Sequence, residues 1–191
     1  MGIYKYVRKL WKQPKSNLGE LWQERLILWR KEPVTVRIEK PTRIDRARSL
    51  GYKAKEGYII VRARVKRGGR KRERRNTGRR SKTMTSKKVV GKSYRWVAEE
   101  RVNRKYINCE VLGSYEVGKD GKSYWFEVIL GDRSKLSKYP ETTWIGLNKN
   151  KGKVWRGRTS AGRKSRGLRG NKGKGAEKIR PSLRSHKRRS K

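Results

Sequence analysis

The sequence predicts an α+β protein: a small, four-stranded, mainly antiparallel sheet packed with helices, plus long basic extensions. Three observations predict this class. Apolar residues recur at helical spacing near the N-terminus and again over residues 94–108. Apolar and polar residues alternate at 34–38, 57–66, 111–117 and 124–130, as in half-buried strands. Two further stretches, rich in lysine, arginine and glycine, contain almost no apolar residue that a core could bury.

The N-terminal part is predicted to form two helices. Residues 3–12 place their apolar side chains at helical spacing, and Pro14 breaks this helix. Ser16 or Asn17 can cap a second helix, which ends before Pro33. The two helices hold three of the seven tryptophans, and we expect their rings to pack in the core rather than to stack on nucleic-acid bases.

A third, short helix is predicted over residues 43–50, because both of its ends are marked. Thr42 can cap the first turn, and the Asp45 carboxylate favours the positive end of the helix dipole. Gly51 can adopt the left-handed conformation that closes a helix.

The strand at 57–66 alternates two sets of side chains. Its apolar set is expected to join the core and consists of Val61, Ala63 and Val65. Its cationic set is expected to form an exposed row and consists of Arg62, Arg64 and Lys66.

Ser93 can cap a helix over residues 94–108. Acidic and basic residues are expected to pair on its surface, Glu99 and Glu100 with Arg104 and Lys105. A hairpin follows, with its turn at Asp120-Gly121. Its alternating side chains are Val111, Gly113, Tyr115 and Val117 on one strand and Tyr124, Phe126, Val128 and Leu130 on the other. Short helical segments are predicted at 134–139, 141–147 and 160–167.

Charge divides the chain into a domain and two extensions. The formal net charge is +41, which would drive self-repulsion in a compact monomer. Residues 66–92 hold thirteen lysines and arginines against one acid, and residues 149–191 hold eighteen against one acid. We therefore expect a globular domain over 1–148 with an inserted basic arm at 66–92, followed by an extended basic tail over 149–191.

Several classes of function lack the residues that they need. The single cysteine, Cys109, forms no internal disulfide and suggests a reducing compartment, and the single histidine, His186, lies in the tail. No apolar run is long enough to span a membrane, and no phosphate-binding glycine loop is present. Glu116 and Glu127 on the hairpin are expected to be surface partners of basic residues. The sequence thus predicts no enzyme, metal, cofactor or small-molecule substrate.

Polyanion binding is the function that the basic stretches favour. Arginine contacts phosphate with two hydrogen bonds, and interleaved glycines let backbone donors approach as well. The candidate RNA-binding residues lie after the short helix, along the strand and arm, and in the tail. They are Tyr52, Lys53, Lys55, Arg62, Arg64, Lys66, Arg67, Gly68, Gly69, Arg70, Lys71, Arg72, Arg74, Arg75, Arg79, Arg80, Lys82, Arg156, Arg158, Arg163, Lys164, Arg166 and Arg169.

Three hypotheses remain open on the residues alone. Extended basic arms suit a deep, folded RNA, and no sequence-specific DNA-binding or RNA-binding signature is present. The same electrostatics would serve a chromatin-like protein that binds DNA without sequence preference. An RNA-processing enzyme with basic arms is the third possibility, against which the lack of histidine and cysteine clusters argues.

The sequence also resembles the L-fifteen-e family of large-subunit ribosomal proteins, found in archaea and eukaryotes. The similar segments follow the family order from the first residue into the tail. They are residues 1–6, 45–58, 64–72, 98–101, 111–115, 126–130 and 159–168. The chain differs from the eukaryotic members mainly between 73 and 93 and after 169, and its compact length resembles that of archaeal members.

The resemblance implies a structural protein of the large ribosomal subunit, located in the cytoplasm within the ribosome. Its implied partners are the large-subunit ribosomal RNA and neighbouring ribosomal proteins, without a membrane. It also implies a four-stranded antiparallel sheet with long extensions buried in RNA.

Overall fold

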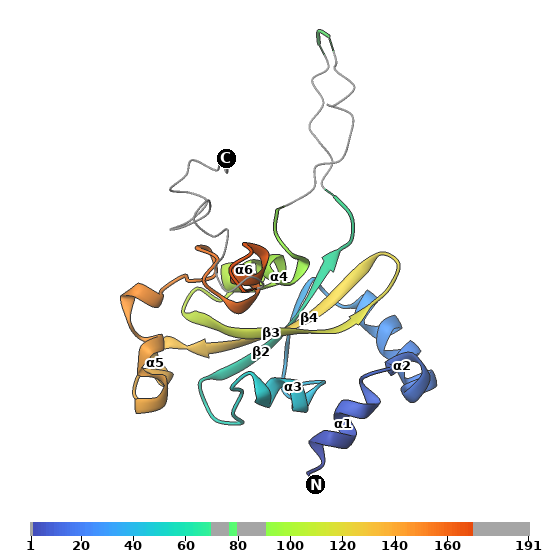
Figure 1. Cartoon of the computed structure of the whole chain (residues 1–191), viewed down its shortest axis with the longest axis horizontal. Coiled ribbons are helices and arrows are strands. Elements are labelled where there is room, and N and C mark those ends of the chain that lie inside the picture. Colours follow the sequence, from blue (N-terminus) through green and yellow to red (C-terminus); the bar gives the residue numbers. More distant parts are fainter. Residues whose placement is uncertain (1, 70–76, 80–90, 170–191) are drawn as a thin grey trace.

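A four-stranded antiparallel sheet with the strand order β1-β2-β4-β3 forms the centre of the fold (Figure 1). A computed structural model describes residues 2–69, 77–79 and 91–169. The strands are β1 (Thr35–Ile38), β2 (Tyr58–Lys66), β3 (Cys109–Lys119) and β4 (Ser123–Asp132). This architecture confirms the predicted α+β class and its antiparallel sheet.

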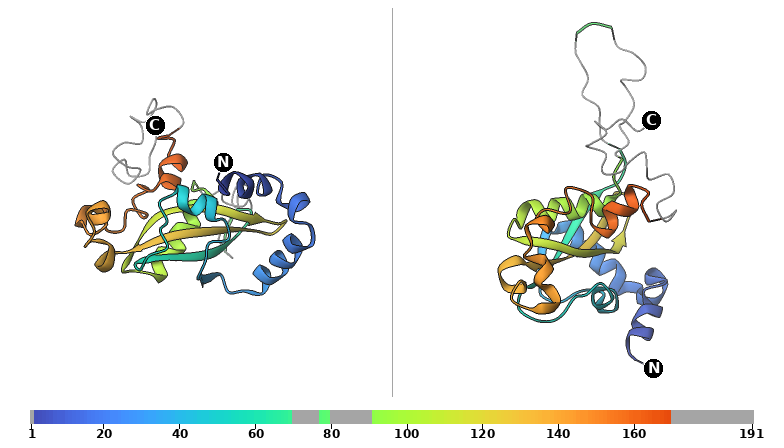
Figure 2. Two further views of the ribbon diagram at one scale, coloured as in Figure 1. Left: turned by 90° about the horizontal axis from the view of Figure 1, so that it is seen from below. Right: turned by 60° about the vertical axis from the view of Figure 1, so that its left-hand side comes forward.

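Helices cover both faces of the sheet (Figures 1 and 2). One face carries α1 (Tyr4–Leu10), α2 (Pro14–Lys31) and α3 (Ile44–Ser49). The other face carries α4 (Tyr94–Lys105) and α6 (Ser160–Ser165). The short segments α5 (Arg133–Leu136), η2 (Pro140–Ile145) and η3 (Asn148–Asn150) follow β4 at the end of the sheet.

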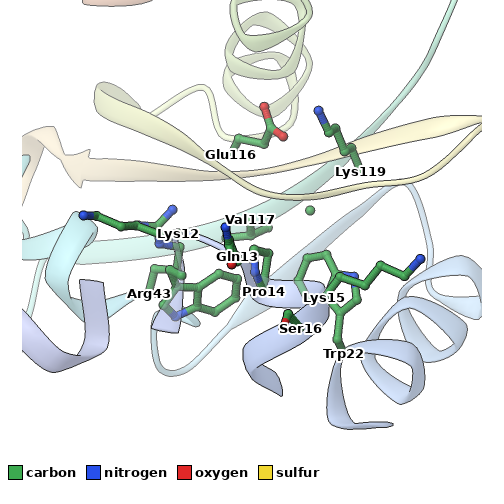
Figure 3. Close-up of a pocket in the computed structure, with 12 residues that line it drawn as sticks. Lys12, Gln13, Pro14, Lys15, Ser16, Trp22, Arg43, Glu116, Val117 and Lys119 are labelled. Atoms are coloured by element: carbon green, nitrogen blue, oxygen red, sulfur yellow. The ribbon is translucent and has the colours of Figure 1, made fainter. Parts of the chain in front are cut away.

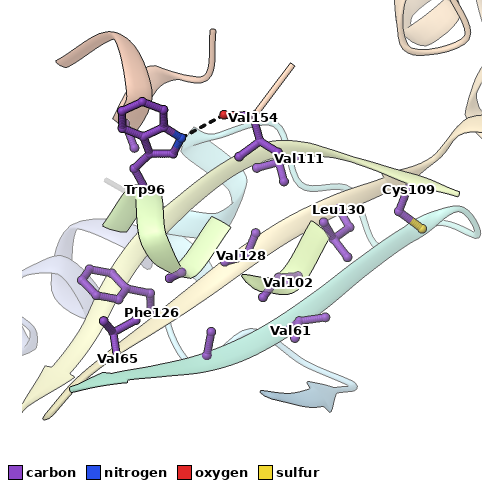
Figure 4. Close-up of a cluster of buried hydrophobic side chains, with 13 residues drawn as sticks. Val61, Val65, Trp96, Val102, Cys109, Val111, Phe126, Val128, Leu130 and Val154 are labelled. Carbon is purple, nitrogen blue, oxygen red and sulfur yellow. Dashed lines mark hydrogen bonds between the residues drawn. The ribbon is translucent and has the colours of Figure 1, made fainter. Parts of the chain in front are cut away.

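The core beneath α4 contains the apolar residues that the alternation in β2 and β4 predicts (Figure 4). Val61, Ala63 and Val65 are buried there, as expected. Ala98 and Val102 of α4 pack against them. Trp96 closes one edge of this core by donating its indole N–H to the backbone oxygen of Val154 at 2.9 Å.

The second core, under α2 and α3, is built around tryptophan. Trp11, Trp22, Trp29 and Trp125 follow one another with ring centroids 6.0 to 6.1 Å apart. Trp22 and Trp29 are buried, and the Trp125 indole N–H donates to the Trp29 backbone oxygen. The burial of Trp22 and Trp29 agrees with the expectation that these tryptophans pack in the core, whereas Trp11 is only half-buried.

Helix ends follow the predictions in two places and differ in two. Ser93 caps α4 by accepting a hydrogen bond from the Trp96 N–H, and Gly51 closes α3 with a φ of 91°. Thr42 is not a cap, because α3 begins one residue later and the Thr42 N–H donates to Glu127. Neither Ser16 nor Asn17 is a cap, because α2 begins at Pro14 with Gln13 at the cap position, and the Asn17 amide donates to the last carbonyls of α1.

The alternation predicted for β3 is wrong, because two register shifts interrupt the strand. The first shift, between Val111 and Gly113, adds one residue opposite β4. Val111 therefore faces the core beneath α4, whereas Tyr115 and Val117 face the tryptophan core.

Two glutamates that were expected on the surface are buried. Glu127 accepts hydrogen bonds from the Tyr115 hydroxyl at 2.5 Å and from the Thr42 N–H at 3.1 Å. Glu99 is also fully buried, and its surface pairing with basic residues of α4 does not form. Burial is the main cause that raises the pKa of both carboxyl groups, and the hydrogen bonds oppose it.

Candidate nucleic-acid interface

The predicted basic arm leaves the domain at the end of β2. The Arg67 guanidinium lies over the ring of Tyr124, with Cζ 5.2 Å from the ring centroid. The next residue, Gly68, has a φ of 89° and donates its N–H to the Tyr94 hydroxyl at 2.8 Å. Because other residues rarely adopt this φ, Gly68 fixes the direction in which the chain leaves the sheet.

The chain rejoins the domain at the start of α4. Lys92 donates to Glu100 at 2.7 Å and lies 4.9 Å from the centroid of a Trp96 ring. The Ser93 N–H donates to the hydroxyl of Ser165, the last residue of α6, at 3.0 Å. The C-terminal end of α6 therefore lies beside the point where the arm returns (Figure 1).

A buried polar network holds α6 on the domain. Thr159 donates its hydroxyl to Glu99 at 2.6 Å and caps α6 by accepting the Gly162 N–H at 3.2 Å. Ser114 donates to the other oxygen of Glu99 at 2.5 Å and accepts from the Arg95 guanidinium at 2.7 Å. One carboxylate thus joins α6, α4 and β3.

The first part of the predicted tail, residues 149–169, is not extended. Val154 and Ala161 are buried in the core beneath α4. Gly162 also lies so close to the backbone of Gly157 that a Cβ at Gly162 would stand 2.7 Å from the Gly157 Cα. This segment belongs to the packed domain, and α6 presents its basic side chains from a fixed position.

Cations gather around the arm ends and α6 on a surface that we call the basic face. It consists of the exposed Lys66, Lys92, Arg158, Arg163, Lys164 and Arg169 together with the half-buried Arg95 and Arg166. The contact between Ser93 and Ser165 places the returning end of the arm beside α6, and the hydrogen bond from Gly68 to Tyr94 places the leaving end beside the start of α4.

Like charges on the basic face perturb one another. Burial lowers the pKa of Arg166, and the neighbouring Arg158 and Arg163 lower it further. Burial also lowers the pKa of Arg95; Glu99 opposes this effect, and Arg46 and Arg169 add to it. A bound anion would relieve this repulsion, and phosphate suits guanidinium groups because it accepts two hydrogen bonds from each.

The prediction of an exposed cationic row on β2 is wrong at Arg62. This side chain is buried, donates to both oxygens of Glu32, with the shortest contact at 2.6 Å, and stacks its guanidinium 5.0 Å from a Trp29 ring. Arg64 is half-buried and donates to the backbone oxygen of Arg30 at 2.6 Å. Lys66 is the member of the row that is exposed.

The candidates after α3 lie away from the basic face. The Tyr52 ring packs edge-on against Tyr58 at 6.2 Å in the tryptophan core. Lys53 and Lys55 are both exposed, and Lys53 forms an ion pair with Glu141. Nothing in this geometry joins them to α6.

The remaining candidates fall into two groups. Gly69, Arg79 and Arg156 are exposed, and Arg156 also donates to the backbone oxygens of Lys149 and Lys151. Seven candidates lie outside the described residues: Arg70, Lys71, Arg72, Arg74, Arg75, Arg80 and Lys82.

The described residues offer little for catalysis. Burial and nearby carboxylates raise the pKa of the Cys109 thiol to about 11, so this cysteine is protonated and unreactive near neutral pH. No group of three histidine, cysteine, aspartate or glutamate side chains within the described ranges could hold a metal ion. None of the described helices combines the length and the apolar character that crossing a membrane requires.

Sequence reasoning missed Arg95 and Lys92 as parts of this surface. Arg95 interacts electrostatically with Arg46 of α3 and with Arg169 after α6, although these residues are far apart along the chain. Lys92 and Arg95 lie on either side of the Ser93 cap, where the basic arm ends and α4 begins. This position next to the arm could have indicated that they belong to the same surface.

Comparisons with known proteins agree with the resemblance. A family model described as Ribosomal L15 matches residues 2–186. Large ribosomal subunit protein eL15 of Nanoarchaeum equitans is 53% identical over 188 residues, which cover 97% of this chain and 98% of that protein. The proteins of the same name from Methanocorpusculum labreanum and Methanocella arvoryzae are 51% and 50% identical, over 97% and 98% of this chain and 96% and 97% of theirs. The chain therefore belongs to the Ribosomal L15e family.

Proposed function

We propose that this protein is a structural constituent of the large ribosomal subunit and binds folded large-subunit ribosomal RNA. The observation that carries the proposal is the similarity, at about half of all positions and along nearly the whole chain, to proteins named for that subunit. The protein catalyses no reaction in this role. Its partners are the ribosomal RNA and neighbouring ribosomal proteins, and it acts in the cytoplasm.

The basic face supplies the physical basis for RNA binding. Arg158, Arg163 and Lys164 crowd around α6, and the hydrogen bonds of Thr159 hold this helix in place. Phosphates of a folded RNA neutralise this charge, and the release of counterions drives binding. The arm and the tail extend the same contact, since glycine and arginine together let the chain approach phosphates and 2′-hydroxyls.

A competition experiment tests the choice of nucleic acid. Labelled, folded large-subunit RNA bound to the full chain is challenged with unlabelled RNA or duplex DNA at physiological salt. The proposal predicts that RNA competes at much lower concentration. Equal competition by duplex DNA would favour a free, sequence-nonspecific DNA-binding protein instead.

A deletion tests the arm. Removing residues 66–82 should abolish incorporation into large subunits, because it removes ten of the fifty-seven basic residues, all from one stretch. The domain should still fold, as judged by its circular dichroism and cooperative unfolding. Normal incorporation of the deleted protein would refute the assignment of the arm.

A further inference from the structure

A cavity of about 840 Å³ lies between the turn that joins α1 to α2 and the end of β3 (Figure 3). Its volume is in the range of sites that hold small ligands. It lies beside α1 and α2, and Arg43 in its wall also lines a neighbouring hollow that contains Arg95 of the basic face. Neither the basic arm nor the tail accounts for it.

The wall of the cavity offers planar groups for stacking. Trp11 and Trp22 line it with their ring centroids 6.0 Å apart, and Trp11 is only half-buried. The Arg43 guanidinium lies over Trp11, with Cζ 5.1 Å from the ring centroid, and the Arg25 guanidinium lies 5.9 Å from the same centroid. Arg43 pairs with Asp45 through Nη2 at 3.4 Å, and its Nε has no hydrogen-bond partner within the described chain. Unstacked RNA bases bind to aromatic rings and to guanidinium planes of this kind.

The rim of the cavity is cationic. Lys12 and Lys15 come from the α1–α2 turn and the start of α2, and Lys119 comes from the end of β3 (Figure 3). All three are exposed, and no ion pair is recorded between them and any described residue. Glu116 is the single acid in the lining.

We propose that this cavity binds one unpaired nucleotide of an RNA chain. The base lies against Trp11 and Arg43, and the flanking phosphates lie at Lys12, Lys15 and Lys119. The occupant must combine a flat, apolar surface with negative charge, and a nucleotide does so whereas an apolar peptide has no charge to match the rim. The inference rests on the proposed function and adds an RNA contact beside the turn between α1 and α2.

Two RNA hairpins that differ only by one bulged nucleotide test this site. Affinities of the full chain for both are measured by fluorescence anisotropy at a salt concentration at which the paired hairpin still binds. Stacking of one base predicts that the bulged hairpin binds roughly tenfold more tightly. The ratio of the two affinities cancels the nonspecific attraction of the basic arms.

Two variants and a matched control test whether the preference for the bulged hairpin arises at this cavity. Trp11→Leu removes the ring, and the triple variant Lys12→Gln, Lys15→Gln, Lys119→Gln removes the rim charge; both should reduce the ratio towards one. The control removes the same charge from exposed lysines elsewhere: Lys31→Gln, Lys105→Gln, Lys138→Gln. It should weaken both hairpins and keep the ratio. The triple lysine variant changes only exposed side chains, so it decides the question if Trp11→Leu unfolds the protein.

Equal affinity of the wild-type chain for the two hairpins would overturn the proposal and would point to a protein segment as the occupant. A preference that persists in the triple lysine variant would also overturn it, because the bulge would then bind elsewhere. Either result could occur while the chain still prefers ribosomal RNA to duplex DNA, so the proposed function would stand. Loss of the preference for ribosomal RNA over duplex DNA would instead contradict the proposed function.

Discussion

The hydroxyl of Thr159 should contribute several times the stability of an ordinary surface hydrogen bond, because it both caps α6 and joins that helix to the domain. It donates to the buried Glu99 carboxylate and accepts the Gly162 N–H. Thr159→Val removes both hydrogen bonds and keeps the shape of the side chain. Losing a helix cap costs about 0.5–2 kcal/mol, and leaving a buried acceptor without its donor costs about 1–3 kcal/mol. We expect the free energy of unfolding to fall by about 2–4 kcal/mol.

Urea unfolding followed by tryptophan fluorescence measures this change, in salt high enough to screen the charge of the chain. Thr143→Val is the control: Thr143 is exposed, its hydroxyl donates only to the nearby Tyr139 backbone oxygen, and its loss should cost less than about 1 kcal/mol. In a Glu99→Gln background the Thr159→Val effect should shrink towards that of the cap alone. A Thr159→Val protein within about 0.5 kcal/mol of wild type would refute the view that this network docks α6.

Three further predictions address the buried ion pair, the buried carboxylates and the basic face. Arg62→Met should lower the free energy of unfolding by about 2–4 kcal/mol, because it leaves Glu32 without its partner in a site where little of either side chain is exposed; the exposed Lys31→Met is the control. Burial raises the pKa of Glu127, so the folded protein holds this proton more tightly than the unfolded chain, and stability should fall as pH rises from about 4 through the raised pKa. Glu127→Gln should lack that part of the decline when unfolding free energies are compared across pH, and an unchanged pH profile would contradict the assignment. Replacing Arg158, Arg163, Lys164 and Arg169 by Gln should reduce the log–log salt slope of RNA binding by roughly 3, and an unchanged slope would remove α6 from the interface.

Local signals predicted most of the secondary structure. The cap at Ser93, the helix end at Gly51 and the turn at Asp120-Gly121 each depend on contacts with residues nearby in the chain. The local sequence is therefore enough to predict them. The alternation in β2 and β4 likewise reflects a core that contacts every second residue. These elements fixed the antiparallel sheet and the class of fold.

Charged residues that are buried could not be predicted in the same way. The Arg62 side chain is paired with Glu32, thirty positions away, and Glu127 is paired with Tyr115 and Thr42. Alternation places such residues on one side of a strand, but it does not reveal that a second layer covers that side. The extra residue in β3 has no compositional signature either, so the faces of Tyr115 and Val117 followed only from the structure.

The sequence predicted which segments of the candidate interface are basic, but not how these segments come together in space. Basic, glycine-rich stretches identify the arm and the tail as polyanion-binding segments. The docking of α6 beside the arm depends on Glu99, whose role requires three elements to meet. The cavity between Trp11 and Lys119 also joins residues more than a hundred positions apart, and periodicity carries no information about such a contact.

Sedimentation tests the central claim most directly. A cell extract is separated on a magnesium-containing gradient, with and without a wash in high salt, and this protein is quantified in every fraction. The proposal predicts that the protein sediments with large ribosomal subunits and stays there in moderate salt, because its basic residues are buried in folded RNA. A protein that stays near the top of the gradient, or that leaves in the first salt wash, would contradict an integral role in the subunit and would favour a free nucleic-acid-binding protein.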